Sequence, residues 1–439
     1  MGFYPLFWEI ATTTESSYSK QAQELKKHGI TGIHNRKLSA SAICQARQKI
    51  KASAFDEASQ TVIDCAGNDQ DNFLYWNGFQ IIGGDATSAW LDNPQYQAII
   101  DSLNTKDHAR LRKSPTIYDA KHKQFHMVTL YDTLNKLTLT SNYALKNIGE
   151  RELIAPLIGS IPDDSILVLD RGYKANWLYY ALIKMKKKFC VRISIEANCN
   201  WQKDFIASGE VETFREFYIE KKYFSNLNKI GIRPRKRCKV KLRVVRVDLN
   251  DGEVELLVSN LLPSEVKTEQ FKSLYHQRWP VEGSYDLLKN TLKLESWNAR
   301  SKSGLEQEIA AKIFAANLNS YMASSIRKEF HGKSYTAHQE KNTKKSWNKN
   351  CPYRYSINMT ECIREVKGAL PSLMLAKWNQ YATSPPLPSR KNLRDFVKEL
   401  QYELWRSRNW IRLDIETDNE RRFKTDRRGK PPGANRKIS

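Results

Sequence analysis

The chain has 439 residues, which is enough for a sizeable core and for two or three domains. Its 71 lysines and arginines stand against 48 aspartates and glutamates, a formal net charge of +23. This excess indicates a polyanionic partner, either nucleic acid or an acidic membrane surface, over a merely soluble basic protein. The seven cysteines include no C-x-x-C pair, which argues against a disulfide framework or a zinc cluster and for a reducing, cytoplasm-like compartment.

The apolar N-terminus lacks the basic segment of a secretory signal. No apolar run approaches the roughly 18 residues that a membrane-spanning helix needs. We therefore expect no contact with a membrane, and nucleic acid becomes the expected partner.

Residues 1–70 are predicted to form a helical N-terminal region that binds DNA. Within residues 38–50 apolar side chains recur at helical spacing, Ser39 or Ser41 can cap the helix, and basic residues such as Arg47 surround the apolar stripe. A helix-turn-helix unit fits this pattern, and so does an ordinary amphipathic helix with a solvated basic face. Taken alone, the segment favours the ordinary helix.

Residues 71–195 are predicted to form the first part of an α/β core. One apolar strand ends on Asp85, and a short buried strand ends on Asp170. Strands are expected at 80–85, 125–131, 137–143, 166–170 and 189–193, and helices at 150–157 and 175–185. An antiparallel meander followed by alternating helices and strands predicts a mixed sheet flanked by helices.

Residues 196–254 are predicted to form a β-rich, basic insertion. From Lys239 onward basic and apolar residues alternate, which places Lys239, Lys241 and Arg243 on one cationic face of a strand whose other face is buried. Arg235 belongs to the basic run before this strand. We expect these four residues to bind DNA.

The rest of the chain is predicted to return to the core and then to become polar. Residues 255–330 form the second part of the core, with a strand at 255–261 and helices at 267–295 and 305–329. A C-terminal helical region, which opens with a lysine-rich loop, is expected over 331–405. The basic tail, 406–439, is expected to be partly disordered.

Asp85 and Asp170 are expected at equivalent strand ends of one sheet. Either aspartate alone is more often a cap for the following turn, and pairs of this kind occur in many phosphate-handling enzymes. Phosphodiester cleavage requires an activated attacking oxygen and a neutralised leaving oxygen. Two divalent metals about 4 Å apart, held by three or more carboxylates, meet both needs, so a third acid is required.

The segment 275–289 supplies that acid. Its residues Tyr275, Arg278, Glu282 and Lys289 have the spacing of the Y-R-E-K signature, and the segment resembles DDE transposases of the insertion-sequence group that cut and paste DNA through hairpin ends. Two further stretches resemble the acid motifs of that family, Asp170-Arg171-Gly172-Tyr173 the second and Asp85-Ala86-Thr87 the first. The resemblance covers approximately residues 35–330.

This resemblance implies a DNA transposase with an RNase H-like mixed-sheet core, a β-rich insertion and flanking helical regions. Asp85, Asp170 and Glu282 would bind two Mg²⁺ ions, for which Mn²⁺ could substitute, and would cleave insertion-sequence ends and join them to target DNA. Arg278 and Lys289 would hold backbone phosphates near the scissile bond.

Aromatic side chains of the signature would also act on the DNA. Tyr275 would position the terminal strand through its hydroxyl group. Trp279 would stack on an extruded base, or it is an ordinary core aromatic.

Pro280 allows two local structures, either a kinked helix or a new helix that begins at the proline. In the second case Glu282 lies in the first turn, where the positive helix end favours its ionised form. Glu282 and Lys289, two turns apart, would share a helical face.

The partners that the resemblance implies are double-stranded DNA, as inverted-repeat ends and as target, and a second copy of the chain in a synaptic homodimer. The expected location is the bacterial cytoplasm at the nucleoid. Two alternatives stay open. One is an RNase H-like metal nuclease without strand transfer, and the other is a non-catalytic DNA-binding protein derived from a transposase.

Overall fold

A computed structural model of the chain describes residues 10–11, 17–27, 39–92, 95, 98, 124–145, 148–235, 238–249, 253–331, 353–367 and 409–412. The chain forms two compact units, residues 1–321 and 322–439. In the second unit β9 (Tyr353–Ser356) pairs antiparallel with β10 (Asn409–Arg412), and residues 359–367 are helical. Most of the predicted C-terminal region and basic tail lies outside the described residues.

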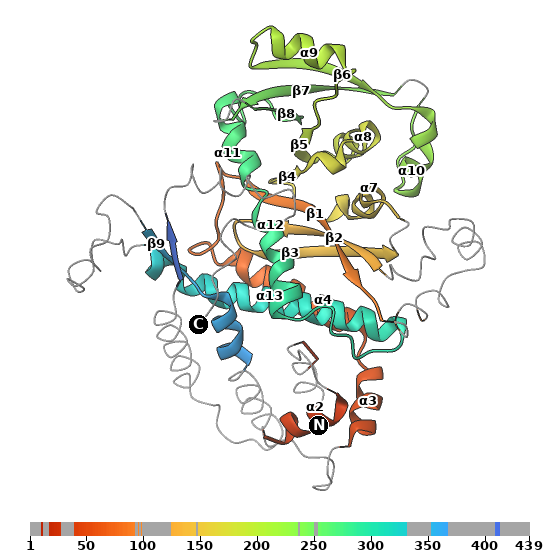
Figure 1. Cartoon of the computed structure of the whole chain (residues 1–439), viewed down its shortest axis with the longest axis vertical. Coiled ribbons are helices and arrows are strands. Elements are labelled where there is room, and N and C mark those ends of the chain that lie inside the picture. Colours follow the sequence, from red (N-terminus) through yellow and green to blue (C-terminus); the bar gives the residue numbers. More distant parts are fainter. Residues whose placement is uncertain are drawn as a thin grey trace, which may run out of the picture. The chain divides into compact units, whose positions relative to one another are not determined.

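The first unit is built on an eight-stranded mixed sheet with the order β3-β2-β1-β4-β5-β8-β7-β6 (Figure 1). The strands β1, β4 and β5 run parallel, and all other neighbours are antiparallel. The strands are β1 (Gln80–Trp90), β2 (Gln124–Asp132), β3 (Leu137–Leu145), β4 (Ser165–Leu169), β5 (Lys188–Ile193), β6 (Glu212–Tyr218), β7 (Lys239–Asp248) and β8 (Val254–Ser259). The predicted α/β core, a mixed sheet flanked by helices, is confirmed.

Helices lie along the sheet and before it in the chain. The α-helices of this unit are α2 (Tyr18–Lys27), α3 (Ala40–Gln48), α4 (Ala52–Asn68), α7 (Glu150–Ile154), α8 (Asn176–Lys184), α9 (Asn200–Ala207), α10 (Phe224–Lys229), α11 (Phe271–His276), α12 (Pro280–Asp286) and α13 (Lys302–His331), which runs past residue 321. Short helical turns are η3 (Ala155–Ser160), η4 (Arg171–Tyr173), η5 (Lys221–Tyr223), η6 (Thr268–Gln270) and the π-helical η7 (Leu287–Thr291). Among the described residues, no helix has the length and apolar character needed to span a membrane.

The two faces of the sheet are buried by different helices. In β4 every residue is buried, as parallel central strands require. Leu167 and Leu169 belong to the hydrophobic cluster that includes α8, whereas Ile166 and Val168 belong to the cluster that includes α11. Side chains therefore alternate between an α8 face and an α11 face along each core strand.

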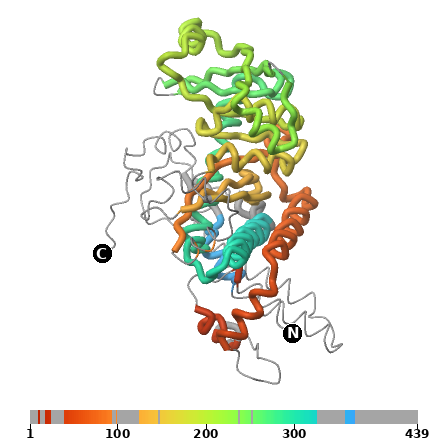
Figure 2. Tube along the Cα trace, turned by 90° about the vertical axis from the view of Figure 1, so that its right-hand side faces the viewer, coloured from red at the N-terminus to blue at the C-terminus, as the bar shows by residue number. Residues whose placement is uncertain are grey.

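The N-terminal helices pack against α13. Figure 2 shows α4 beside α13, and the rings of Phe55 and Phe314 are 6.5 Å apart. The predicted Ser39 cap is present, since its hydroxyl accepts from Ala42 N at 3.1 Å. The expected solvated position of Arg47 is wrong, because Arg47 is 4% exposed and contacts Glu308 on α13 at 2.8 Å.

The predicted β-rich insertion does not form a separate layer. Its strands β6 and β7 extend the core sheet, because β7 pairs with β8 and β8 pairs with β5. It also contains α9 and α10, where the sequence periodicity predicted no helix.

Arg243 departs from its predicted place on an exposed cationic face. Only 1% of its surface is exposed, and its guanidinium donates to Glu212 Oε2, to the Val266 carbonyl and to the Thr268 hydroxyl at 2.9, 2.7 and 2.8 Å. Its position lies under the segment that leads into α11, with the ring of Phe271 5.0 Å away. The exposed basic face of β7 therefore ends at Lys241, and Arg243 cannot contact DNA in this conformation.

Replacing Arg243 by Met tests this assignment. The change removes the guanidinium that pairs with Glu212 and donates to the Val266 carbonyl, so we expect the free energy of unfolding to fall by about 3 kcal/mol in urea titrations. The matched control Lys241→Met removes an exposed lysine of the same strand and should change it by less than about 0.5 kcal/mol. Equal stability of the two variants would contradict the buried network.

Candidate active site

Asp85 and Asp170 lie side by side on neighbouring parallel strands. The parallel pairing of β1 with β4 ends at Gly84↔Leu169, and the next residue on each segment is an aspartate. Since paired strands lie about 4.8 Å apart, the backbone brings the two carboxylates together. Alternation places both on the α11 face, because Val168 precedes Asp170 by two residues and packs on that face.

The prediction that Asp85 ends its strand is wrong. β1 continues to Trp90, because β2 pairs with it antiparallel as far as Trp90↔Gln124. Asp170 does follow the last residue of β4, and its Oδ1 accepts from Gly172 N at 2.9 Å, as a turn cap does. Asp85 thus occupies the point at which β1 loses its parallel partner.

The two glycines before Asp85 allow β1 to be packed closely on both faces. A Cβ on Gly84 would lie 2.5 Å from Leu169 Cδ2 and 2.8 Å from Ile154 Cδ1. A Cβ on Gly83 would lie 3.3 Å from Val281 Cβ, on the α12 side. A side chain at position 84 would require the ends of the Leu169 and Ile154 side chains to move.

Pro280 begins a new helix. It stands at the N-terminus of α12, and Glu282 lies in the first turn, so the second of the two expected arrangements is confirmed. The helix changes to the π-helical turn η7 before Lys289, so the α-helical spacing that predicted a shared face for Glu282 and Lys289 does not apply directly.

Arg278 links two of the candidate acids. Its Nη2 lies 3.0 Å from Glu282 Oε1, and its Nη1 lies 3.7 Å from Asp85 Oδ2. The residue is 5% exposed, and the ring of Trp279 is 4.5 Å from its guanidinium carbon. The loop between α11 and α12 therefore supplies a buried positive charge at the position where the acids meet.

Two further side chains, one from α12 and one from the following turn η7, form hydrogen bonds to the backbone of β1. The hydroxyl of Tyr285 donates to the Asp85 carbonyl at 2.5 Å and lies 2.9 Å from Thr129 Oγ1. The Lys289 amine donates to the Ser88 carbonyl at 2.5 Å. The sequence analysis gave no role to Tyr285, although its place one turn beyond Glu282 was a signal that it shares that helix face.

The other aromatic residues of the signature are less accessible than expected. Tyr275 is 4% exposed and belongs to the core cluster on the α11 face, so its ring packs in the interior. Trp279 is partly buried. Burial raises the pKa of Tyr275 to about 12, which keeps its hydroxyl protonated as a donor.

The charge of Asp85 is poorly compensated. Burial raises the pKa of its carboxyl, the neighbouring charges of Asp170 and Glu282 add to the rise, and the net value is about 6. The Ala86 amide and Arg278 oppose this shift without cancelling it. A cluster of acids whose charges repel one another is typical of a functional site.

The three acids fit a divalent metal in their chemistry but not in their present arrangement. Carboxylate oxygens are the ligands that Mg²⁺ prefers. Within the described part of the chain, however, no three carboxylate, imidazole or thiol groups come close enough to hold a metal ion. The contacts of Arg278 with Asp85 and Glu282 occupy part of the space between the acids.

A second basic region lies on the edge of the sheet. Lys239 and Lys241 of β7 are exposed, and the segment before β7 exposes Arg235. The paired strand β6 adds two exposed rings, Phe214 and Tyr218, at 46% and 58%. We call these five residues the β6–β7 surface. The sequence analysis did not predict a role for Phe214 and Tyr218, although their spacing of four residues on one strand indicates that they share a face.

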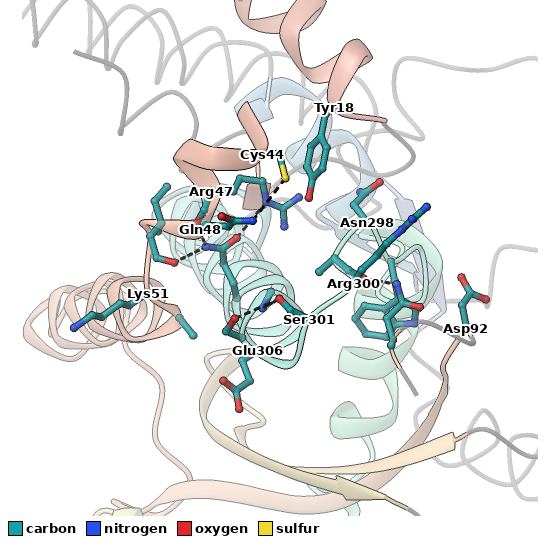
Figure 3. Close-up of a pocket in the computed structure, with 18 of the residues that line it drawn as sticks. Tyr18, Cys44, Arg47, Gln48, Lys51, Asp92, Asn298, Arg300, Ser301 and Glu306 are labelled. Carbon is teal, nitrogen blue, oxygen red and sulfur yellow. Dashed lines mark hydrogen bonds between the residues drawn. The ribbon is translucent and has the colours of Figure 1, made fainter. Parts of the chain in front are cut away.

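A cavity of about 930 Å³ lies between α3, the segment 297–301 and the start of α13 (Figure 3). None of the three acids lines it. Its lining carries both positive side chains, such as Lys51 and Arg300, and negative ones, such as Asp92 and Glu306. It therefore has no marked preference for one sign of ligand charge.

The raised pKa of Asp85 generates a stability prediction. A carboxyl whose pKa is higher in the folded than in the unfolded chain opposes folding once it ionises, so its penalty is absent below about pH 4 and complete above about pH 7. We expect Asp85→Asn to raise the free energy of unfolding by about 2 kcal/mol at pH 8 and not at pH 4.

The control for this measurement is an aspartate whose pKa is shifted in the opposite direction. The Lys187 amine holds the pKa of the Asp163 carboxyl below its usual value. Asp163→Asn should therefore not raise the free energy of unfolding at either pH 4 or pH 8. An Asp85→Asn protein no more stable than wild type at pH 8 would contradict the poorly compensated charge.

Comparison with known proteins places the chain in a family. A family model described as a transposase DDE domain matches residues 93–318. No curated protein matches the chain. The cryo-EM structure of a piggyBac transposase synaptic complex with hairpin DNA is similar over 90% of this chain and 85% of that chain, with 9% sequence identity and a TM-score of 0.35. Since the family match spans just over half of the 439 residues, the chain belongs to the DDE transposase domain family.

Proposed function

We propose that the chain is an active DNA transposase that binds insertion-sequence ends, cleaves them and joins them to target DNA. Asp85, Asp170 and Glu282 are its catalytic carboxylates. One observation carries the proposal: acids from β1, from the end of β4 and from α12 gather on one face of a sheet that lies largely within a DDE domain. Asp85 and Glu282 are close enough to share the Arg278 guanidinium.

The proposal includes a need for divalent metal. The acids would hold two Mg²⁺ ions, with Mn²⁺ as a substitute, after Arg278 has left them. The support is the donor chemistry of three carboxylates together with the raised pKa of Asp85, which comes mainly from burial and to a smaller extent from the charges of Asp170 and Glu282.

The basic side chains around the acids are proposed to hold the DNA backbone. Arg278 would donate through its planar fork and Lys289 as a point charge, each to a phosphate near the scissile bond. Trp279, which is partly buried, is proposed to stack on an unpaired base. Tyr275 would need a local movement to reach the DNA, because it is 4% exposed.

A plasmid excision assay with the inverted repeats that flank the gene tests the function. Wild-type protein should excise and rejoin DNA, and a plasmid with one end should not react, since we propose a homodimer that bridges two ends. Glu282→Gln should reduce excision by at least about a thousandfold while end binding is unchanged. The matched control Glu220→Gln, at an exposed ion pair with Lys222, should excise normally.

The other outcomes of this assay separate the alternatives. Cleavage without rejoining would identify a metal nuclease, and end binding without cleavage would identify a non-catalytic DNA-binding protein. Normal excision by Glu282→Gln would rule out the proposed triad. Excision in bacterial cells would also support a cytoplasmic site of action at the nucleoid.

The β6–β7 surface is proposed as a second contact with DNA phosphates. Replacing Lys239 and Lys241 by Gln should weaken binding and lower the slope of log affinity against log salt by about 1 to 2, since each neutralised phosphate contributes about 0.9. Lys239 contributes less than Lys241 if its ion pair with Glu216 persists. An unchanged salt slope in fluorescence anisotropy titrations would exclude this surface.

A further inference from the structure

The position of Arg278 conflicts with simultaneous metal binding by all three acids. Its two terminal nitrogens contact Asp85 and Glu282, which come from different elements of the fold. The residue is buried, and the charged carbon of its guanidinium lies over the Trp279 and Tyr275 rings, at 4.5 and 5.9 Å from their centres. A divalent ion held by Asp85 and Glu282 would meet this positive charge at close range.

The contacts of Arg278 are also incomplete. The distance of 3.7 Å to Asp85 is long for a hydrogen bond, and the Nε of Arg278 is buried without a hydrogen-bond partner among the described residues. Glu282 keeps half of its side chain exposed. Arg278 is therefore held by charge more than by full hydrogen bonding, and a better acceptor could displace it.

We propose that Arg278 is the internal counter-cation of the acids before catalysis, and that a DNA phosphate releases it. Bidentate pairing with a phosphate would satisfy the planar fork of the guanidinium. Its departure would leave Asp85 and Glu282 without their shared cation and so raise their affinity for a divalent metal. This inference rests on the proposed function, since it assumes that DNA binds beside the acids.

The consequence is a positive coupling between DNA and metal. If DNA raises the affinity for metal by some factor, metal must raise the affinity for DNA by the same factor. The acids would then assemble a metal site mainly on DNA, which would limit metal binding by the free protein. Lys289 cannot serve this purpose in the present conformation, because its amine contacts the Ser88 carbonyl and Glu295 rather than the acids.

Calorimetric and electron paramagnetic resonance titrations with Mn²⁺ test the coupling in the full chain. The DNA is a duplex that stops at the outer end of the inverted repeat, so that no bond remains to be cut, and Mn²⁺ binding by the duplex alone is subtracted. For wild type we expect the Mn²⁺ affinity to rise by about tenfold or more on DNA. For Arg278→Met we expect a raised affinity without DNA and a further rise of less than about twofold with it.

Three variants sharpen the result. Lys222→Met removes an exposed lysine that pairs with Glu220 and has no part in the site, and its Mn²⁺ affinity without DNA should match that of wild type. Arg278→Lys keeps the charge but loses the fork, so its Mn²⁺ affinity without DNA should lie between wild type and Arg278→Met. It also provides the test if Arg278→Met does not fold. Glu282→Gln should lose Mn²⁺ binding under all conditions.

The failures are distinguishable. If wild type binds no Mn²⁺ on DNA and excises nothing, the proposed function fails. If wild type excises DNA but binds Mn²⁺ equally well with and without the duplex, the coupling is wrong and the function stands. The coupling is also wrong if neither Arg278 variant gains affinity without DNA.

Discussion

The close packing of α12 on β1 is the constraint on which the candidate site depends. Gly83 and Gly84 remove the side chains that would hold β1 away from Val281 on one face and from Leu169 and Ile154 on the other. The Tyr285 hydroxyl and the Lys289 amine then donate to carbonyls of β1 itself. Glu282 is distant in sequence from Asp85. These contacts hold it next to β1, the strand that carries Asp85.

The same packing creates an electrostatic conflict. The parallel register of β1 with β4 brings two aspartates together, and α12 adds a glutamate, in a region where burial already opposes ionisation. A buried arginine, Arg278, contacts two of the three acids and compensates part of their charge. A fold that holds repelling acids together around one buried arginine is organised for binding rather than for maximal stability.

The sequence predicted the features that depend on local patterns. Apolar runs located the core strands, and the proline at position 280 restricted the local structure to two arrangements, of which a new helix is the one present. The sequence-based predictions were wrong where the structure depends on contacts between residues that are far apart in the chain. β1 runs past Asp85 because β2 pairs with it, and Arg243 is buried because a segment more than twenty residues later covers it. The spacing of the signature predicted Arg278 and Glu282 as functional residues, but only their three-dimensional arrangement shows that they contact each other.

The central claim is that Asp85, Asp170 and Glu282 form one catalytic unit. Cleavage of a labelled end duplex by purified protein with Mg²⁺, compared between wild type and Asp170→Asn, tests it most directly. Among the described residues, the acids that form ion pairs with Arg278 are Asp85 and Glu282, so the loss of the Asp170 carboxylate should leave Arg278 in place. The account predicts a cleavage rate lower by at least about a thousandfold with unchanged affinity for the duplex. Cleavage by Asp170→Asn within about tenfold of wild type would contradict it.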